Sequence, residues 1–373
     1  MVVISRCVSC QSLLLIILCW MKGSALNLYP NKIQAEWIIR DDSNLITPKR
    51  SGHVAFQSAN GRLFVFGGYA EEDDVSNNDE DRGVKRRYVT NDLWEWTDTG
   101  WAPLTQKGDI PGPRLVSACG ILGNSMYLLG GWDPQDQGTG GIILDTVHKL
   151  DLESLEWKHL HDLHLPGGPT SRHVCLKISN EKLLIHTHRC HQNQVILFDG
   201  KSFHSQSTTG DCPSSRGLHS ATVISENHVL FFAGAAQEGT MSNECFVLCT
   251  KTWEWTRLQI ISDDQPSPRA SPCLCCYDSH CAIAFGGASR SSLGLEASND
   301  VWALHIDSNY QTASWELLSG SSPLLSHPPA RNAATLNHIS TLKDGTKEYL
   351  LHGGWAPFIR TYTDAYILRI RPL

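Results

Sequence analysis

Histidines are the residues of this chain best suited to metal or acid–base chemistry. In an extended strand, His186 and His188 would share one face and could present two imidazoles to a metal ion. No carboxylate or cysteine accompanies them at a recognised ligand spacing, so surface or core histidines are the simpler interpretation and no metal is predicted. The cluster consists of His159, His161, His164, His173, His186, His188 and His191.

Cysteines form a second group, at Cys273, Cys275, Cys276 and Cys281. Neighbouring residues of a strand point to opposite faces, so Cys275 and Cys276 fit a closed tetrahedral zinc site poorly. A disulfide between Cys276 and Cys281 would need an oxidising compartment. Free thiols packed as small apolar side chains are the other interpretation.

Arginines and aromatic residues form a third group, whose chemistry is binding. Guanidinium groups beside aromatic rings suit an acidic protein segment or a carbohydrate. The recurring arginines have a second interpretation as structural struts, because they repeat with the scaffold. The predicted binding residues are Arg50, Tyr69, Arg114, Trp132, Arg216, Arg269, Arg290, Arg331, Trp355 and Arg360.

Recognised catalytic motifs are missing from the sequence. It has no His-Glu-x-x-His pair, no phosphate-binding loop and no nucleophile elbow between a strand and a helix. We therefore assign no catalytic residue and no cofactor.

A repeated unit positions all of these residues. It begins with an Arg after a Pro, continues through an apolar strand and a second strand ending in Gly-Gly, and reaches an Asn-Asp turn, a third strand and a Trp. Each unit has the length of one four-stranded propeller blade. The third copy is degenerate, with Thr187-His188 at the Gly-Gly position and Phe203 at the Trp position. The six copies begin at Arg50, Arg114, Arg172, Arg216, Arg269 and Arg331.

The sixth copy reaches Leu373 without a fourth strand. An extra segment, 34–39, precedes the first copy, and its Trp37 stands before Arg50 at the spacing by which Trp101 precedes Arg114. We expect this N-terminal strand to complete the last blade and to close the ring, which protects strand edges.

The paired glycines, the following Asn-Asp and the spaced tryptophan make the chain resemble the kelch-repeat proteins. The resemblance implies an all-β, six-bladed kelch β-propeller with the galactose oxidase-like fold, whose loop face around the channel binds partners. A superfold hosts many functions, so we expect a binding or scaffold module for a protein or a glycan. The alternative is a propeller enzyme, an oxidase or epimerase-like, that uses the channel mouth.

Two kelch enzyme types can be compared with the sequence. Copper radical oxidases need extra domains and a tyrosine–cysteine pair that cannot be placed here. The specifier proteins of glucosinolate breakdown space Glu, Asp and His four residues apart. This chain has Glu296 and Asp300 in that register, but Leu304 follows and His305 comes one residue late. A shift of one residue turns a side chain to the other face of a strand, so iron binding is disfavoured.

The first 25 residues form an apolar leader. Arg6 precedes the apolar run 13–21, and Gly23-Ser24-Ala25 offers small residues for cleavage. We expect a signal peptide over 1–25 and the propeller over 26–373, which would place the protein in the secretory pathway or outside the cell. The run is short for a stable membrane span. A cytoplasmic protein is the alternative, because no Asn-x-Ser/Thr acceptor follows the leader.

Charge excludes one class of partner. The formal net charge is −7, and the basic stretch Lys85-Arg86-Arg87 directly follows an acidic run. This is no nucleic-acid footprint. The acidic loop between Tyr69 and Tyr88 could recognise a basic partner or a cation, but dense like charges favour a solvated loop. We expect a monomeric propeller.

Overall fold

The structure is a computed structural model. It describes residues 32–39, 48–73, 85–134, 141–190, 193–292, 294–318 and 327–373. The predicted leader lies outside the described residues. The described part of the chain contains strands and no helix, so it offers no helix that could cross a membrane.

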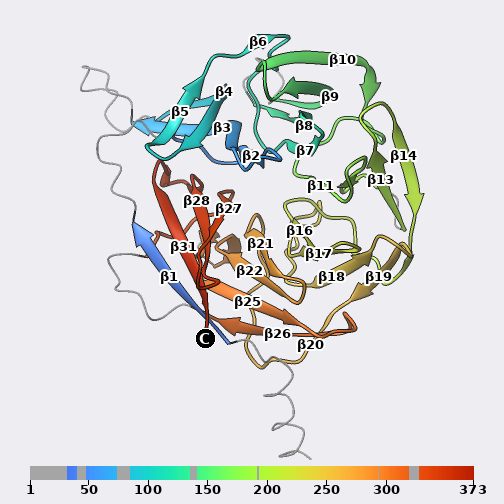
Figure 1. The fold of residues 1–373 in the computed structure, drawn as a ribbon, viewed down its shortest axis with the longest axis vertical. Coiled ribbons are helices and arrows are strands. Elements are labelled where there is room, and N and C mark those ends of the chain that lie inside the picture. Colours follow the sequence, from blue (N-terminus) through green and yellow to red (C-terminus); the bar gives the residue numbers. More distant parts are fainter. Residues whose placement is uncertain are drawn as a thin grey trace, which may run out of the picture.

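Six antiparallel sheets are arranged in a ring around a central channel, each forming one blade (Figure 1). The predicted six-bladed β-propeller is confirmed. Blade 1 consists of β2 (Val54–Gln57), β3 (Leu63–Asp73), β4 (Lys85–Thr97) and β5 (Gly100–Leu104). Blade 2 consists of β7 (Ala118–Leu122), β8 (Ser125–Asp133), β9 (Ile142–Asp151) and β10 (Glu156–His164). Blade 3 consists of β11 (Val174–Lys177), β12 (Leu183–His186), β13 (Gln194–Phe198) and β14 (Phe203–Ser207).

The second half of the ring repeats this order. Blade 4 consists of β16 (Ser220–Ser225), β17 (His228–Phe232), β18 (Cys245–Cys249) and β19 (Glu254–Arg257). Blade 5 consists of β21 (Cys273–Asp278), β22 (Cys281–Phe285), β25 (Val301–Ile306) and β26 (Thr312–Leu317). Blade 6 consists of β27 (Thr335–Thr341), β28 (Lys347–His352), β31 (Ala365–Pro372) and β1 (Ile33–Ile39).

Short additional strands extend three of the blades, and others form hairpins within two loops. A segment between blades adds a parallel fifth strand to the next blade, which ties neighbouring blades together. These strands are β6 (Lys107–Gly108) on blade 2, β15 (Thr209–Gly210) on blade 4 and β20 (Gln259–Ile260) on blade 5. Two loop hairpins consist of β23 (Ala288–Ser291) with β24 (Gly294–Ala297), and β29 (Trp355–Ala356) with β30 (Arg360–Thr361).

The N-terminal strand closes the ring, as predicted. β1 pairs antiparallel with β31 from Ile33 opposite Pro372 to Ile39 opposite Tyr366. Trp37 is 4% exposed and packs edge-on against Phe285 of blade 5, with ring centroids 5.1 Å apart. The strand therefore belongs to blade 6 and also contributes to the core between blades 5 and 6.

The hydrophobic core is divided among the seams between blades. Each of six buried clusters joins the inward faces of two neighbouring blades. Between blades 1 and 2, for example, Phe66 meets Trp157 with ring centroids 5.0 Å apart. The repeat tryptophan thus packs against the preceding blade, which explains why it recurs once in each unit.

A closed ring of backbone hydrogen bonds lines the channel. One residue of each blade donates its N–H to the carbonyl of the equivalent residue in the preceding blade, over 2.7 to 3.1 Å. All six have a positive φ between 48° and 61°, although only Gly52 is a glycine. The conformation costs free energy for the other five residues and persists because the ring imposes it. The ring residues are Gly52, Val116, Arg172, Leu218, Ser271 and Ala333.

The ring corrects the register of blade 3. The repeat arginines Arg114 and Arg216 precede their ring residues by two positions, whereas Arg172 is itself the ring residue. The position of the repeat arginine is therefore held by Thr170, whose carbonyl accepts the N–H of Gly131 over 2.9 Å. Sequence alone misplaced the start of the third copy at Arg172, because an arginine lies only two residues from the expected site.

Replacement of Trp37 by alanine tests the closure. The change should lower the free energy of unfolding by about 3–5 kcal/mol, because it leaves a cavity in the core between blades 5 and 6. Urea unfolding would measure the loss. Ile39→Ala on the same strand, where the side chain is 50% exposed, should change stability by less than about 0.5 kcal/mol. Equal effects of the two substitutions would contradict the packing.

Candidate functional site

The repeat arginines are buried inside the blades. Arg331 is 1% exposed and donates to the carbonyl oxygen of Gly353 over 2.9 Å and to both carboxylate oxygens of Asp364 over 2.5 and 3.0 Å. Arg269 makes the same contacts with Gly286 and Asp300. The guanidinium group therefore ties the Gly-Gly turn of its blade to the start of the third strand.

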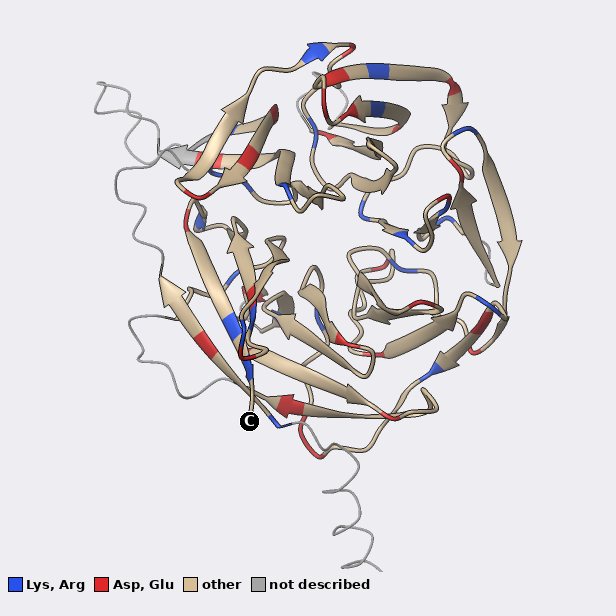
Figure 2. Ribbon diagram, in the orientation of Figure 1, with Lys and Arg blue, Asp and Glu red and all other residues tan. Residues whose placement is uncertain are grey.

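The other repeat arginines vary this contact. Arg50 bonds Gly67 and Asp92, and Arg216 bonds Ala233 and Glu244. Arg114 bonds Gly130 and the Thr146 hydroxyl, and burial lowers its pKa to about 10. This geometry favours the strut interpretation for Arg50, Arg114, Arg216, Arg269 and Arg331, and we do not carry these five into a binding surface. Figure 2 shows that several blades have Lys or Arg positions on the ribbon near the centre of the ring.

The paired glycines leave room for the strut segment of the next blade. A side chain on Gly67, which has a φ of 67°, would place its Cβ 2.8 Å from the carbonyl oxygen of Arg114. Gly68 instead donates its N–H to that same oxygen over 2.8 Å. The repeat needs glycine here because the next blade's strut segment approaches the turn closely.

Three predicted aromatic residues lie on one face of the propeller. Tyr69, Trp132 and Trp355 each follow a Gly-Gly turn, and each pairs through its backbone with the residue after a strut arginine. They belong to blades 1, 2 and 6, which are consecutive in the closed ring. We call the face that carries these turns the loop face.

Two hairpins on the loop face expose apolar side chains. Phe358 and Ile359, in the turn between β29 and β30, are 72% and 64% exposed. Ile142 and Ile143, opposite Asp133 and Trp132 in the hairpin of β8 and β9, are 41% and 37% exposed. Sequence reasoning missed these four residues, because an apolar pair beside a turn is indistinguishable from the end of a buried strand.

The two remaining predicted binding arginines, Arg360 and Arg290, differ in their surroundings, and Arg172, which was not predicted to bind, joins the first of them beside aromatic residues. Arg360 lies over the Tyr362 ring, 5.0 Å from the centroid, within the blade 6 hairpin. Arg172, freed by the register of blade 3, lies over Trp132 at 5.8 Å. Arg290 borders a hollow of about 380 Å³ with Glu238 and Ser267, on blades 4 and 5. The structure therefore brings Arg360 and Arg172 to the aromatic residues and leaves Arg290 apart from them.

One acidic residue is a buried partner of a predicted site residue. Glu71 is 4% exposed, accepts a hydrogen bond from the Tyr69 hydroxyl over 2.5 Å and lies 3.3 Å from Nε of Arg87. Burial, together with this hydrogen bond, raises the pKa of Tyr69. The expectation of a fully solvated acidic loop is wrong for Glu71, and residues 74–84 lie outside the described part of the chain.

The predicted histidine cluster is divided between two blades, because His159, His161 and His164 lie on β10 of blade 2, and His191 lies outside the described residues. The described residues contain no group of three or more His, Cys, Asp or Glu side chains suited to a metal ion. His186 is buried and contacts His219 of blade 4 instead, with 3.1 Å between Nδ1 and Nε2. His188 is partly exposed and follows the end of β12. His188 therefore lies beyond the strand on which the sequence suggested that it shares a face with His186.

The channel contains a small cavity of about 150 Å³, which all six residues of the hydrogen-bond ring line. His53, His173 and His219 line it, and the ring nitrogens of His173 have no hydrogen-bond partner among the described residues. Burial lowers the pKa of His173 to about 3. The imidazole is therefore neutral at neutral pH and is a weak base.

The residues compared with specifier proteins have other partners. Asp300 is bound by the Arg269 strut, and His305 lies 2.8 Å from a carboxylate oxygen of Glu316. Glu296 is exposed on β24. The three side chains do not form a common iron site in the fold.

The ten cysteines after the leader are free thiols, including Cys276 and Cys281. Burial raises the pKa of Cys273, Cys275 and Cys281. Cys249 differs: burial alone would raise its pKa, but hydrogen bonds from Thr252 and Lys251 outweigh that effect and lower it.

Comparison with known proteins agrees with the fold. The family model described as the KLHDC2/KLHL20/DRC7 Kelch-repeats domain matches residues 24–204 and 186–372. Kelch domain-containing protein 2 of Bos taurus is 22% identical over 324 residues, which cover 66% of this chain and 77% of that protein. Human kelch domain-containing protein 1 is 23% identical over 301 residues, covering 72% of this chain and 70% of that protein.

Other similarities are more distant or partial. Acyl-CoA-binding domain-containing protein 6 of Oryza sativa subsp. japonica is 25% identical, but the match covers only 30% of that protein. Among solved structures, that of YjhT superposes with a TM-score of 0.62 at 14% identity, over 88% of this chain and 99% of that chain. At this identity the superposition supports the fold alone.

Removal of one strut tests the structural role of the repeat arginines. Arg331→Met leaves the Gly353 carbonyl and the Asp364 carboxylate without their donor, so the free energy of unfolding should fall by about 1–3 kcal/mol. Chemical denaturation measures the change. The control Arg290→Met should stay within about 0.5 kcal/mol of the wild type. Wild-type stability of Arg331→Met would refute the strut.

Alkylation tests the cysteine assignments. Cys249 should react first with iodoacetamide in the folded protein, because the thiolate is the nucleophile and its pKa is lowered there. Peptide mass spectrometry after short exposures would give the order of labelling. Cys249→Ser should remove the fast phase, and fast labelling of Cys245 or Cys275 in the native state would contradict their burial.

Proposed function

Because this chain belongs to the kelch-repeat family, we propose that it is a binding module that holds a protein partner on its loop face. The observation that carries the proposal is the exposure of apolar side chains on the hairpins of blades 2 and 6. We define the loop-face rim by Trp132, Ile142, Ile143, Trp355, Phe358 and Ile359.

Exposure of the rim's apolar side chains to water costs free energy in an isolated propeller. Phe358 and Ile359 are among the most exposed large apolar side chains of the described residues, and they lie on a hairpin whose base is packed. Ala356 and Thr361 are buried at that base, and the Thr361 hydroxyl accepts the backbone N–H of Glu71 from blade 1. A rigid hairpin that presents apolar residues to water is typical of an interaction site.

Two arginines lie over aromatic rings, one ring belonging to the rim and the other to a residue next to it. Arg360 lies over Tyr362, and Arg172 lies over Trp132. Arginine beside aromatic side chains is enriched in the energetic centres of protein interfaces. The charges favour a partner segment that carries carboxylates next to apolar residues.

A binding role is favoured over acid–base catalysis at the channel mouth. His173 is buried beside the cavity, but with a pKa of about 3 it would be a poor proton acceptor near neutral pH. The nearby repeat arginines are engaged by carboxylates or carbonyls of their own blades. Both features support a scaffold whose exposed loops carry the specificity.

A double substitution on the loop face, with a control substitution on the opposite face, tests the proposal. Phe358→Ser combined with Ile359→Ser should reduce retention of a specific protein partner at least about tenfold, because loss of a buried apolar anchor costs more than about 1.4 kcal/mol. Quantitative mass spectrometry of proteins retained by each variant from the native cell would measure it.

The control is Leu342→Ser, in the turn between β27 and β28 on the opposite face, where the side chain is 39% exposed. It should retain the partner at the wild-type level. Equal losses from both faces would contradict the loop-face site, and glycan-array binding that survives the rim substitutions without any protein partner would favour the glycan alternative.

A further inference from the structure

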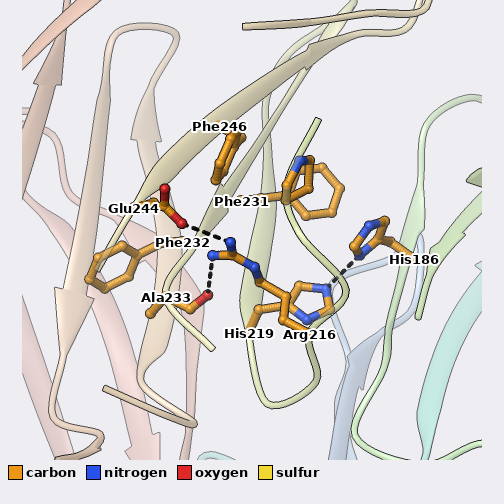
Figure 3. Close-up of a pocket in the computed structure, with 9 residues that line it drawn as sticks. His186, Arg216, His219, Phe231, Phe232, Ala233, Glu244 and Phe246 are labelled. Atoms are coloured by element: carbon orange, nitrogen blue, oxygen red, sulfur yellow. Dashed lines mark hydrogen bonds and ion pairs between the residues drawn. The ribbon is translucent and has the colours of Figure 1, made fainter. Parts of the chain in front are cut away.

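Two pairs of histidines join blades across seams of the propeller. His186, at the end of β12 in blade 3, contacts His219 of blade 4, with 3.1 Å between Nδ1 and Nε2 and 4.9 Å between ring centroids (Figure 3). His352, at the end of β28 in blade 6, faces His53 of blade 1, with ring centroids 5.4 Å apart. The four side chains are 1% to 7% exposed.

The two pairs occupy the same positions in the repeat. His186 and His352 end the second strand of their blades, directly before the Gly-Gly position. His219 and His53 directly follow the ring residues Leu218 and Gly52. The remaining four seams, all described, carry other residues at these two positions: Phe66 with Ser117, Leu129 with His173, Phe232 with Pro272, and Phe285 with Ala334.

The seams with histidine pairs lie opposite one another. One separates blades 3 and 4, and the other separates blades 6 and 1, so each half of the ring contains three blades. Each pair also contacts the repeat tryptophan of the following blade. Trp255 lies 5.8 Å from His186, and Trp101 lies 4.6 Å from His352, measured between ring centroids.

The surroundings of the pair between blades 3 and 4 favour neutral imidazoles. The charged or titratable groups that face it are Arg216, His173 and His188. The carboxylate in that region, Glu244, is bound by Arg216 (Figure 3). It also forms an ion pair with Arg257. Apolar contact comes from Phe231. A proton added to this pair would therefore meet cations and apolar rings.

The pair between blades 6 and 1 has the same kind of surroundings. Arg50 and Arg331 are the charged groups that face it, and their own carboxylate partners are Asp92 and Asp364. The Thr335 hydroxyl lies 3.0 Å from Nε2 of His53. At both seams, the second proton would place two positive charges across the boundary between blades.

The histidine pKa values agree with this geometry. Burial, followed by the positive charge of Arg216, lowers the pKa of His186 to about 4. Burial and neighbouring histidines and arginines lower those of His53, His219 and His352. Since the folded state binds these protons less readily than the unfolded chain, stability falls as pH drops below about 6.5, the ordinary histidine value.

We propose that the two histidine pairs make this propeller an acid-sensitive ring that loosens along the two opposite seams rather than uniformly. The seam between blades 6 and 1 borders the blade 6 hairpin of the loop-face rim, whose Thr361 hydroxyl accepts the backbone N–H of Glu71 from blade 1. If the proposed function holds, loosening of this seam also releases the partner. The seam opening itself does not depend on that function.

Hydrogen–deuterium exchange measured by mass spectrometry tests the proposal on the intact chain, at about pH 7 and about pH 5, on either side of the ordinary histidine pKa. At acid pH, exchange corrected for its intrinsic rate should increase in β12 and β16, and in β28 and β2. Strands of blade 5, such as β21 and β22, whose two seams carry no histidine at these positions, should change less. For each histidine, the opening constant should rise up to about tenfold per pH unit.

The other blades suggest the variants. His186→Phe and His352→Phe introduce the residue found at the same position in blades 1, 4 and 5. Together they should reduce the selective acid response at both seams, because each seam then contains one buried histidine instead of two. His186→Phe alone should reduce it only between blades 3 and 4, which keeps the test valid if the double variant does not fold. His204→Asn, which replaces an exposed histidine on β14, should leave the response unchanged.

Three results would overturn the proposal. One is equal acid loosening of all six seams, another is no change between the two pH values, and the third is a selective response that is undiminished in the double variant. Loss of seam loosening in the variants together with unchanged partner retention at low pH would leave the switch intact and refute only its link to the proposed function.

Discussion

The closed ring of six backbone hydrogen bonds around the channel is the constraint on which the rest of the structure depends. It places one residue of every blade in the left-handed conformation and links the blades head to tail, from Gly52 through Ala333 and back to Gly52. Five of these residues carry a side chain, so the conformation is maintained by the closed ring and not by local preference. Closure in turn requires β1, which joins blade 6 from the other end of the chain.

The buried arginines act around this ring as struts. Each fixes the turn after the second strand against the third strand of its own blade. The carbonyls of four of them, Arg50, Arg114, Arg269 and Arg331, also receive an N–H from the preceding blade. Blade 3 lacks the strut, since Thr170 holds its position. The same blade places Arg172 on the ring, close to Trp132 of blade 2. In blade 3, the strut position therefore lacks an arginine, and the nearby Arg172 is exposed at the surface.

The division between a packed interior and exposed loops accounts for both the proposed partner binding and the proposed response to acid. Six seam cores hold the blades with apolar side chains, and the loop face carries the exposed residues Phe358 and Ile359. Two seams add buried histidines at positions where other blades use phenylalanine or leucine. Apolar contacts do not respond to pH, whereas a buried imidazole among arginines is destabilising once it is protonated. The two kinds of seam therefore divide one ring into parts of different acid stability.

The sequence by itself determined the blade number, the strand order and the closing strand, because these follow from local patterns: alternating strands, Gly-Gly turns and the spacing of Trp37. It also supplied both interpretations of the repeat arginines. Only the tertiary structure decided between them, since the partner of Arg50 is Asp92, 42 residues away. Contacts between distant strands likewise decide three other features. These are the register of Thr170 and Arg172, the burial of Glu71, and the pairing of His53 with His352. A repeat specifies which residues enter the interior, whereas the closed ring decides which of them meet.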